Sequence, residues 1–258
     1  MEITPDQAFN ADDFSAPVVG IAAKMGQHDS GRHSHQRHQL LFAASGCITI
    51  ELADTLCLLP PSRAAWIPAN TMHRAMMRGV MDYRSLYFTP SLPLSALPLH
   101  IAAVNPLLFA VIERMAFWPW DMPADQQQSL LTVFTQEIQQ ARHENWRLSY
   151  PRDRRLQGWL INVHQGGLPP RLQQLAQKIG ASERTISRIF IQETGMNYQS
   201  WRQQWRLLKA IELLADGAAI HHVAQQLEFI SDSAFICFFR QHTGVTPMHY
   251  AREHLSIR

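Results

Sequence analysis

Four side chains in the first third of this 258-residue sequence are of types that bind cations. His33 and His35 are two residues apart, so an extended chain places them on one face, and Gln39 and His73 follow. Three imidazoles and a side-chain oxygen can hold a borderline divalent metal, although an amide lacks the charge of a carboxylate. The group fits a metal site, a metal-free pocket for a small effector, or histidines that serve only the fold. We prefer the metal-free pocket, for which no cofactor is required.

The second half of the sequence offers a different chemistry, because arginine carries almost all of its positive charge. Of the 23 basic residues only Lys24, Lys178 and Lys209 are lysines. Divided near residue 150, the chain has 10 basic and 13 acidic residues before that point and 13 basic and 8 acidic residues after it. The forked guanidinium suits phosphates and base edges. We therefore expect the second half to bind nucleic acid.

The composition is that of a globular protein, and the length suggests two domains. Residues 1–14 carry four acids and no apolar core, which is not the pattern of a signal peptide. Residues 85–112 lack charged side chains but contain four prolines, which argue against a membrane span. The three cysteines lack zinc-ligand spacing and indicate reduced thiols. We expect a cytoplasmic protein without a membrane partner.

Short apolar runs separated by turn residues occupy residues 38–88. Residues 47–52 alternate with period two, which is typical of a strand. Six such runs at roughly ten-residue spacing predict an antiparallel sandwich or small barrel, and the histidines would lie where it opens. Residues 104–146 instead show two runs of helical spacing. They predict helices that either cover the barrel or pair with a second copy in a homodimer.

An internal repeat organises the last hundred residues. The pattern of residues 172–179 recurs 48 residues later, and that of residues 190–195 recurs 49 residues later. Each copy is typical of a helix, a tight turn and a second helix; in the first copy Gly180 can turn the chain and Ser182 can cap the second helix. This is the helix-turn-helix arrangement, whose second helix enters the major groove of DNA.

The second helix of the first copy has two distinct faces. On a helical wheel Ile186, Ile189 and Phe190 form the buried face, whereas Arg184 and Arg188 project together from the opposite side. Two exposed arginines could be only a solvated surface. In a helix-turn-helix context we favour contact with DNA.

Residues 157–253 resemble the DNA-binding domain of AraC/XylS-type transcription regulators, and the first half resembles a cupin barrel. The first cupin motif is matched by residues 33–35, with Gln39 where a metal-binding cupin carries Glu, and the second by residues 68–73, with Asn70 where Gly is usual. The missing carboxylate weakens the alternative function, a metal-dependent cupin enzyme. The DNA-binding resemblance is carried by Leu175-Ala176, Gly180-Ala181-Ser182, Arg188-Ile189-Phe190, Glu193-Thr194-Gly195, Arg206, Ala210, Leu213-Leu214, Ile220, Val223-Ala224, Phe229, Phe235, Phe239-Arg240, Thr243-Gly244, Thr246-Pro247 and Tyr250.

The resemblance implies two helix-turn-helix units that are joined by one long helix and read successive major grooves. Residues 198–216 fit the joining helix. It would place Trp201 and Trp205 in the cores of the units, and it would leave Arg202 and Arg206 available to phosphates or to salt bridges with acids.

The second unit departs from the family pattern at two positions. Glu228 stands where the turn normally has Gly, so the turn either avoids positive φ or tolerates strain. Cys237 replaces the arginine that matches Arg188. We therefore expect the first unit to carry most of the base readout. The second unit, through Ser231, Ser233 and Arg240, would chiefly fix the register on the DNA backbone.

The sequence thus predicts an α+β chain of two domains: a cupin-like antiparallel β-barrel with covering helices, then an all-α domain with two helix-turn-helix motifs. The expected limits are 1–103 for the cupin-like sensing domain, 104–150 for a helical dimerisation or linker region, and 151–258 for the DNA-binding domain, with its motifs at 172–195 and 220–244. The expected DNA-binding residues are Ser182, Glu183, Arg184, Thr185, Ser187, Arg188, Arg202, Arg206, Ser231, Asp232, Ser233, Ala234, Cys237 and Arg240.

We expect a sequence-specific transcription regulator, an activator or a repressor, rather than an enzyme. Its expected partners are double-stranded promoter DNA, a small-molecule effector sensed by the cupin-like domain and a second copy of the chain, with RNA polymerase as a further candidate. A divalent metal at the histidines is an open alternative. So is a basic protein that binds DNA without sequence preference.

Overall fold

The computed structural model describes residues 1–4, 9–25, 27–78, 81–94, 96–144 and 146–255. The chain forms two compact units. We call Met1–Ile50, Leu58–Trp146 and His254–Arg258 the sheet unit, and Glu51–Cys57 and Arg147–Glu253 the helical unit. Of the expected dimerisation or linker region, 104–150, residues 104–146 belong to the sheet unit and residues 147–150 to the helical unit. Residues 256–258 of the expected DNA-binding domain lie outside the described residues.

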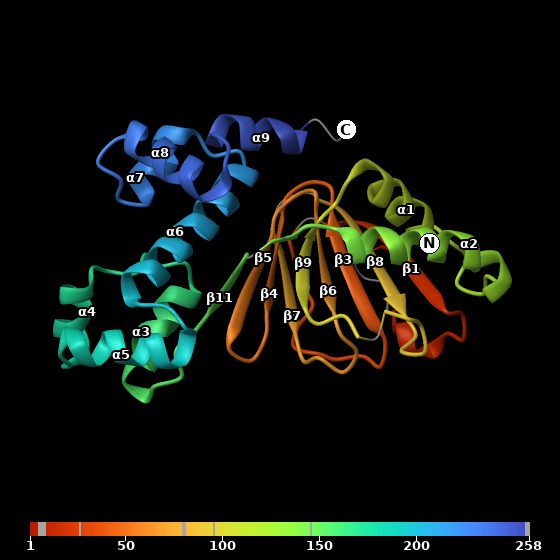
Figure 1. Cartoon of the computed structure of the whole chain (residues 1–258), viewed down its shortest axis with the longest axis horizontal. Helices are drawn as coiled ribbons and strands as arrows, with labels where there is room; N and C mark the ends of the chain where they lie inside the picture. Colours follow the sequence, from red (N-terminus) through yellow and green to blue (C-terminus); the bar gives the residue numbers. More distant parts are fainter. Residues whose placement is uncertain (5–8, 26, 79–80, 95, 145, 256–258) are drawn as a thin grey trace. The chain divides into compact units, whose positions relative to one another are not determined.

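Two antiparallel sheets are described (Figure 1). The first contains, in spatial order, β1 (Val18–Met25), β8 (Met81–Phe88), β3 (His38–Ala43), β6 (Arg63–Ile67), β9 (His100–Ala103) and β10 (His143–Glu144). The second contains β11 (Arg147–Ser149), β5 (Thr55–Leu59), β4 (Cys47–Glu51), β7 (Arg74–Arg78) and β2 (His28–Asp29). The predicted antiparallel, cupin-like architecture is confirmed. A short 3-10 helix, Ala11–Asp13, precedes β1.

Asn70 closes the turn that precedes His73. Its φ of 60° lies in the left-handed region, which asparagine tolerates better than most residues other than glycine. Asn70 can therefore replace the glycine of the cupin pattern. Its backbone N–H donates to the carbonyl of His35 over 2.8 Å, so the turn also holds the loop that carries this histidine.

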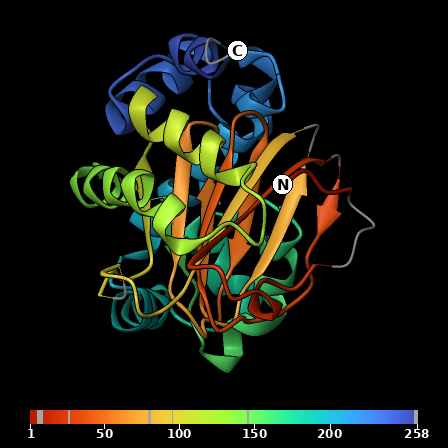
Figure 2. The same cartoon turned by 90° about the vertical axis from the view of Figure 1, so that its right-hand side faces the viewer.

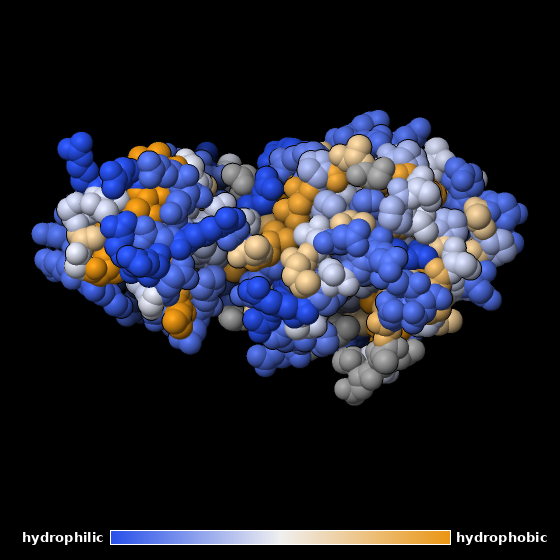
Figure 3. Space-filling view, turned by 90° about the horizontal axis from the view of Figure 1, so that it is seen from below, coloured by the Kyte–Doolittle hydropathy of each residue, from blue (hydrophilic) through white to orange (hydrophobic). Residues whose placement is uncertain are grey.

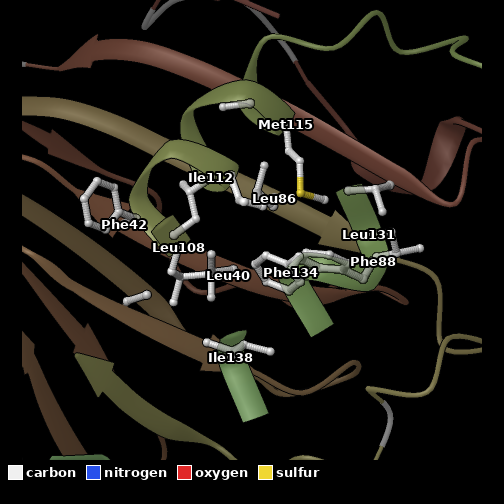
Figure 4. Packing of buried hydrophobic residues seen from close by; sticks show 14 of the residues in the cluster. Leu40, Phe42, Leu86, Phe88, Leu108, Ile112, Met115, Leu131, Phe134 and Ile138 are labelled. Atoms are coloured by element: carbon white, nitrogen blue, oxygen red, sulfur yellow. The ribbon is translucent and has the colours of Figure 1, made fainter. Parts of the chain in front are cut away.

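Helices α1 (Pro106–Ala116) and α2 (Ala124–Gln140) cover the first sheet. Asn105 caps α1, because its side-chain oxygen accepts from the backbone N–H of Leu108 over 2.8 Å. Figure 4 shows the apolar residues of both helices turned towards those of β3 and β8, and Phe134 of α2 stacks on Phe88 with ring centroids 4.8 Å apart. Figure 2 shows the two helices lying against these strands. The prediction that helices cover the barrel is confirmed.

The uncharged residues 85–112 are divided among several elements. They contain the end of β8, all of β9 and the first part of α1. Among the helices that the structure describes, none is both long enough and apolar enough to cross a bilayer.

Seven helices follow one another in the described part of the helical unit. Helix α6 (Tyr198–Ala215) agrees with the predicted joining helix. It follows α3 (Arg154–His164), α4 (Leu172–Ile179) and α5 (Glu183–Thr194), and it precedes α7 (Ile220–Gln226), α8 (Asp232–Thr243) and α9 (Pro247–Leu255).

Helix α6 contributes two buried tryptophans to the apolar core of the helical unit. Trp201 is fully buried, and its ring centroid lies 5.2 Å from that of Phe190 on α5. Trp205 is 6% exposed, which confirms the prediction that both tryptophans are core residues. In the second motif, Phe239 of α8 packs edge-on against Tyr250 of α9, with ring centroids 5.3 Å apart.

The close approach of β1 to α1 requires glycine at position 20. A Cβ atom there would lie 2.3 Å from the carbonyl oxygen of Met115 and 2.7 Å from the Cα of Ala116. We expect Gly20→Ala to push α1 away and to lower the free energy of unfolding by about 1–3 kcal/mol, as in other overpacked cores. Differential scanning calorimetry would measure the loss.

Gly158→Ala is the matched control. Gly158 lies on helix α3, and a Cβ there would point into open space. We therefore expect the substitution to be neutral or to stabilise the protein by up to about 1 kcal/mol. A Gly20→Ala protein as stable as the wild type would contradict the described packing.

Candidate functional site

The structure brings together the four residues of the predicted pocket. His33 and His73 face each other in an isolated antiparallel bridge, in which each backbone N–H donates to the other residue's carbonyl over 2.9 Å. His35 lies just before β3, and Gln39 lies on β3. Ring nitrogens of the three histidines all lie within 4.8 Å of one another. Backbone pairing thus brings together His33 and His73, which are 40 residues apart in the sequence.

All three imidazole rings are held in the same way. Each places Nδ1 next to the backbone carbonyl oxygen of a residue two positions away, at 3.1 Å for His33, 2.6 Å for His35 and 2.9 Å for His73. A carbonyl oxygen only accepts, so Nδ1 carries the hydrogen in each ring, and in a neutral His33 or His73 ring the lone pair lies on Nε2. The carbonyls belong to Gly31, Arg37 and Thr71, respectively.

His73 is the most deeply buried of the three, with 1% of its surface exposed. Desolvation by this burial lowers the pKa of His73 to about 4 and outweighs the hydrogen bond to Thr71, which acts in the opposite direction. The ring is therefore neutral at physiological pH. Among the described residues, Nε2 of His73 has no hydrogen-bond partner, so this lone pair remains for a ligand.

Gln39 connects the histidines to the adjacent strand. Its amide nitrogen donates to Ser85 Oγ over 2.9 Å and to the hydroxyl of Tyr87 over 3.0 Å, while its Oε1 lies 3.0 Å from His35 Nε2. Burial raises the pKa of Tyr87, so this phenol keeps its proton. The sequence analysis missed Ser85 and Tyr87. Ser85 and Tyr87 are two residues apart, so a strand places both side chains on one face. Only the pairing of β3 with β8 shows that this face meets Gln39.

A cavity of about 400 Å³ opens beside these groups. His33, Gln39, His73 and Tyr87 form part of its polar side, and Asp29 lies in the wall, paired with Arg74 at 2.5 Å. Such a mixed cavity suits a small molecule that has an apolar body and a few polar groups. The apolar wall includes Ile3, Phe9, Ile21, Ala75 and Met77.

The first recognition helix, α5, is positioned by a tight turn and a cap. Gly180 has a φ of 67°, and the Ser182 hydroxyl accepts from the backbone N–H of Thr185 over 3.2 Å. Arg184 and Arg188 are exposed, as the helical wheel predicts. Together with Thr185, Ser187, Ile191 and Gln192 they line a shallow hollow of about 520 Å³.

The second recognition helix, α8, presents fewer donors. Ser231 caps it by accepting from the backbone N–H of Ala234 over 3.2 Å, Asp232 is engaged by Nδ1 of His221 at 3.1 Å, and Cys237 is exposed. Ile230, just before the cap, is 97% exposed. The sequence analysis missed Ile230, although it is the extra residue that makes the second turn one residue longer than the first. Seen from below, the helical unit is mostly hydrophilic with small separate apolar areas (Figure 3).

The turn of the second motif adopts positive φ in spite of its sequence. Glu228 has a φ of 55°, so of the two alternatives for this position the structure selects tolerated strain. Its carboxylate lies 3.3 Å from Nη2 of Arg202, whose Nε also donates to the carbonyl of Pro169 over 2.6 Å. The prediction of a salt bridge between an α6 arginine and an acid is confirmed.

The prediction that Arg202 and Arg206 are free to contact phosphates is wrong, because only 6% and 7% of their surfaces are exposed. Arg206 donates from Nε and Nη2 to the carbonyl of Leu227, at 3.0 and 2.7 Å, and its guanidinium lies 3.7 Å from the ring centroid of Phe229. Burial, with the nearby charge of Arg202, lowers the pKa of Arg206 to about 10. A helix end needs donors for its last carbonyls, and Arg206 supplies them to α7.

These features define a class of protein: a helix-turn-helix transcription regulator whose sheet-rich half binds a ligand. Comparison with known families agrees, since residues 15–129 match the "AraC-like ligand binding domain" and residues 175–253 match the "Helix-turn-helix domain". The chain belongs to the AraC/XylS family of transcription regulators.

Individual relatives extend over different parts of the chain. The HTH-type transcriptional regulator NimR of Escherichia coli is 29% identical over 224 residues, which are 84% of this chain and 81% of that protein. The HTH-type transcriptional regulator RipA of Corynebacterium glutamicum is 38% identical over 76 residues, 30% of this chain and 23% of that one. The structure of ToxT from Vibrio cholerae is similar over 92% of this chain and 98% of that one, with 12% identity and a TM-score of 0.37.

The corrected role of Arg206 leads to a stability prediction. Arg206→Ala leaves the buried carbonyl of Leu227 without its charged donor, so we expect the free energy of unfolding of the helical unit to fall by about 2 kcal/mol or more. The variant should keep the wild-type slope of DNA affinity against salt, because no phosphate contact is removed. Urea unfolding followed by tryptophan fluorescence and binding at several salt concentrations would measure both quantities.

The exposed Arg188 provides the control for Arg206. Arg188→Ala should change stability by less than about 0.5 kcal/mol, as is usual for surface substitutions. If Arg206→Ala kept the wild-type stability and reduced the salt slope by about one, the phosphate role would be restored.

Proposed function

We propose that this transcription regulator recognises double-stranded promoter DNA in a sequence-specific manner, mainly through α5. The observation that carries the proposal is the pair of exposed arginines, Arg184 and Arg188, four residues apart on a helix whose other face is buried. Arginine can contact a guanine through two hydrogen bonds and so distinguish it from other bases. Ser182, Glu183, Thr185 and Ser187 lie on the same helix or at its cap and complete the proposed reading surface.

Helix α8 fixes the register of the protein on the DNA backbone. Ser231 and Ser233 at its exposed start, and Arg240 in its last turn, provide donors for phosphates. Where the first motif has Arg188 the second has Cys237, whose thiol is a weak donor. Asp232, Ala234 and Cys237 then face the groove without the paired donors through which an arginine distinguishes guanine.

The cavity beside the histidines binds the effector. It has the polar and apolar walls that a small organic molecule needs, and the unpartnered Nε2 of His73 gives it one specific contact. Binding regulates transcription only if the effector has a higher affinity for the DNA-competent arrangement than for the idle one. The sheet unit thus senses a molecule instead of transforming one, in keeping with relatives that are transcriptional regulators.

Two further parts of the proposal concern assembly and location. The protein acts as a homodimer through α1, where Leu107 on the helix and Phe117 just after its end are 52% and 48% exposed. It works in the cytoplasm, a reducing compartment that keeps the three cysteines of the sequence reduced. RNA polymerase is the partner through which a bound regulator would alter transcription.

Selection of bound fragments from genomic DNA, followed by base-by-base competition, tests the reading role of α5. Arg188→Ala should cost about 1–3 kcal/mol at one base position of the recovered site and leave affinity for a scrambled site nearly unchanged. Cys237→Ala is the matched control and should alter neither value by more than about 0.5 kcal/mol. A larger loss of specificity in Cys237→Ala than in Arg188→Ala would reverse the proposed ranking of the two motifs.

A gain of function tests the same ranking from the other side. Cys237→Arg restores the arginine at an exposed position of α8, so we expect a new preference for guanine in the second half-site, worth about 1–3 kcal/mol. Repeating the fragment selection with this variant would reveal the preference. Recovery of the wild-type site with an unchanged second half would contradict a base-facing position for residue 237.

A further inference from the structure

Ile230, in the turn of the second motif, is the most exposed large apolar side chain among the described residues. It is 97% exposed, whereas the next in order, Ile161 on α3, is 61% exposed. Single apolar residues are common on protein surfaces, but an isoleucine with almost no buried surface contributes almost nothing to the core. The whole Ile230 side chain is therefore available to a partner.

Matching hydrogen bonds in the two turns identify Ile230 as an added residue. In the first turn the backbone N–H of Ala181 donates to the carbonyl of Ala176 over 3.1 Å, and in the second that of Phe229 donates to the carbonyl of Ala224 over 2.9 Å. The serine that caps the next helix follows Ala181 directly, whereas Ile230 stands between Phe229 and its capping serine. The second turn therefore carries one side chain that the first turn lacks.

Phe229 fills the inner side of the second turn and leaves no structural task for Ile230. The ring centroid of Phe229 lies 5.3 Å from that of Phe235 and 5.0 Å from that of Phe238, and the guanidinium of Arg206 lies 3.7 Å from it. These contacts anchor the turn without the next residue. A substitution of Ile230 should therefore leave the fold intact.

The position of Ile230 is at the end of α8 that reads bases in a helix-turn-helix. It precedes the cap Ser231, and Ser233 at the start of the helix is exposed. The N-terminal residues of such a helix contact base edges in the major groove. Phosphates and most base-edge groups are polar and give an isoleucine no favourable contact, whereas the C5 methyl group of thymine is apolar.

We propose that Ile230 packs against the C5 methyl group of a thymine in the half-site under α8, and that it adds a preference for thymine to a motif that otherwise positions the protein. The inference rests on the proposed function, because it requires α8 to lie in the major groove. Burial of one methyl group is worth about threefold in affinity. This is less than a good arginine–guanine pair provides, so the ranking of the two motifs is unchanged.

Replacement of single thymines by uracil in the recovered site tests the contact directly, because it removes only the C5 methyl group. Binding of the full-length protein is measured by fluorescence anisotropy at a fixed salt concentration, with each thymine of both half-sites replaced in turn. We expect one replacement under α8 to weaken binding by about threefold. Ile230→Ser should weaken binding to the unmodified site by about threefold and show no further loss when that thymine is replaced, as a double-mutant cycle requires of two groups in contact.

Ile161→Ser is the matched control, because it makes the same change at an exposed isoleucine outside both motifs. It should bind the unmodified site as the wild type does and keep the threefold loss on uracil DNA. Ile230→Val retains a branched apolar side chain and should keep most of the preference for thymine. Circular dichroism would establish that each variant is folded.

Several results would overturn the inference: a recovered site without thymine under α8, no replacement there that costs more than about 1.5-fold, or the same loss on uracil DNA in Ile230→Ser as in the wild type. Normal DNA binding by Ile230→Ser with a loss of transcriptional regulation would also overturn it and would assign this side chain to a protein partner.

The guanine preference that depends on Arg188 is measured on the same DNA, which separates this inference from the proposed function. If that preference persists without a uracil effect, only the role of Ile230 fails. If the uracil effect depends on Ile230 but Arg188→Ala changes no base preference, the reading role of α5 fails and the role of Ile230 stands. A protein without any preferred site would refute both.

Discussion

The helical unit depends on the burial of α6 between two helix-turn-helix motifs. One helix supplies Trp201 to the first core and Arg206 to the second turn, so neither motif can shift without disturbing the other. Apolar contact alone does not set this arrangement. The two hydrogen bonds from Arg206 to the carbonyl of Leu227 and its stacking on Phe229 hold the end of α7 and the turn that follows it. The strained backbone at Glu228 is held by the same cluster through Arg202.

This arrangement fits a division of two tasks between the motifs: recognition of bases and positioning on the DNA backbone. Arg202 and Arg206 of α6 are used inside the fold, whereas Arg184 and Arg188 of α5 are exposed. Cys237 leaves α8 with little means of distinguishing guanine. We therefore propose an unequal pair of motifs, in which the first recognises bases and the second positions the protein on the DNA backbone.

Local patterns predicted the helical unit well because its elements are defined by short-range periodicity. The repeat of 48 to 49 residues located both motifs, the helical wheel identified the buried Ile186 and the exposed Arg188, and both tryptophans of α6 are buried as expected. The same patterns failed for Arg206. A helical wheel places a charged residue on a face, but it cannot reveal that a carbonyl 21 residues away lacks a donor.

The sheet unit was predicted at the level of strands, and its site only in part. His33, His35, Gln39 and His73 were found from spacing and from the resemblance to a cupin, whereas Ser85 and Tyr87 were missed because they meet Gln39 only through the pairing of β3 with β8. The direction of each ring is likewise set by a carbonyl, which no side-chain motif records. Distant pairing and the orientation of polar groups are therefore what the structure adds.

The central claim, that the two motifs share the work unequally, is tested most directly by the binding free energy of every single-base substitution across the recovered site. The account predicts penalties of about 1–3 kcal/mol concentrated in the half-site under α5, with smaller penalties in the other half. Penalties of equal size in both half-sites would contradict it.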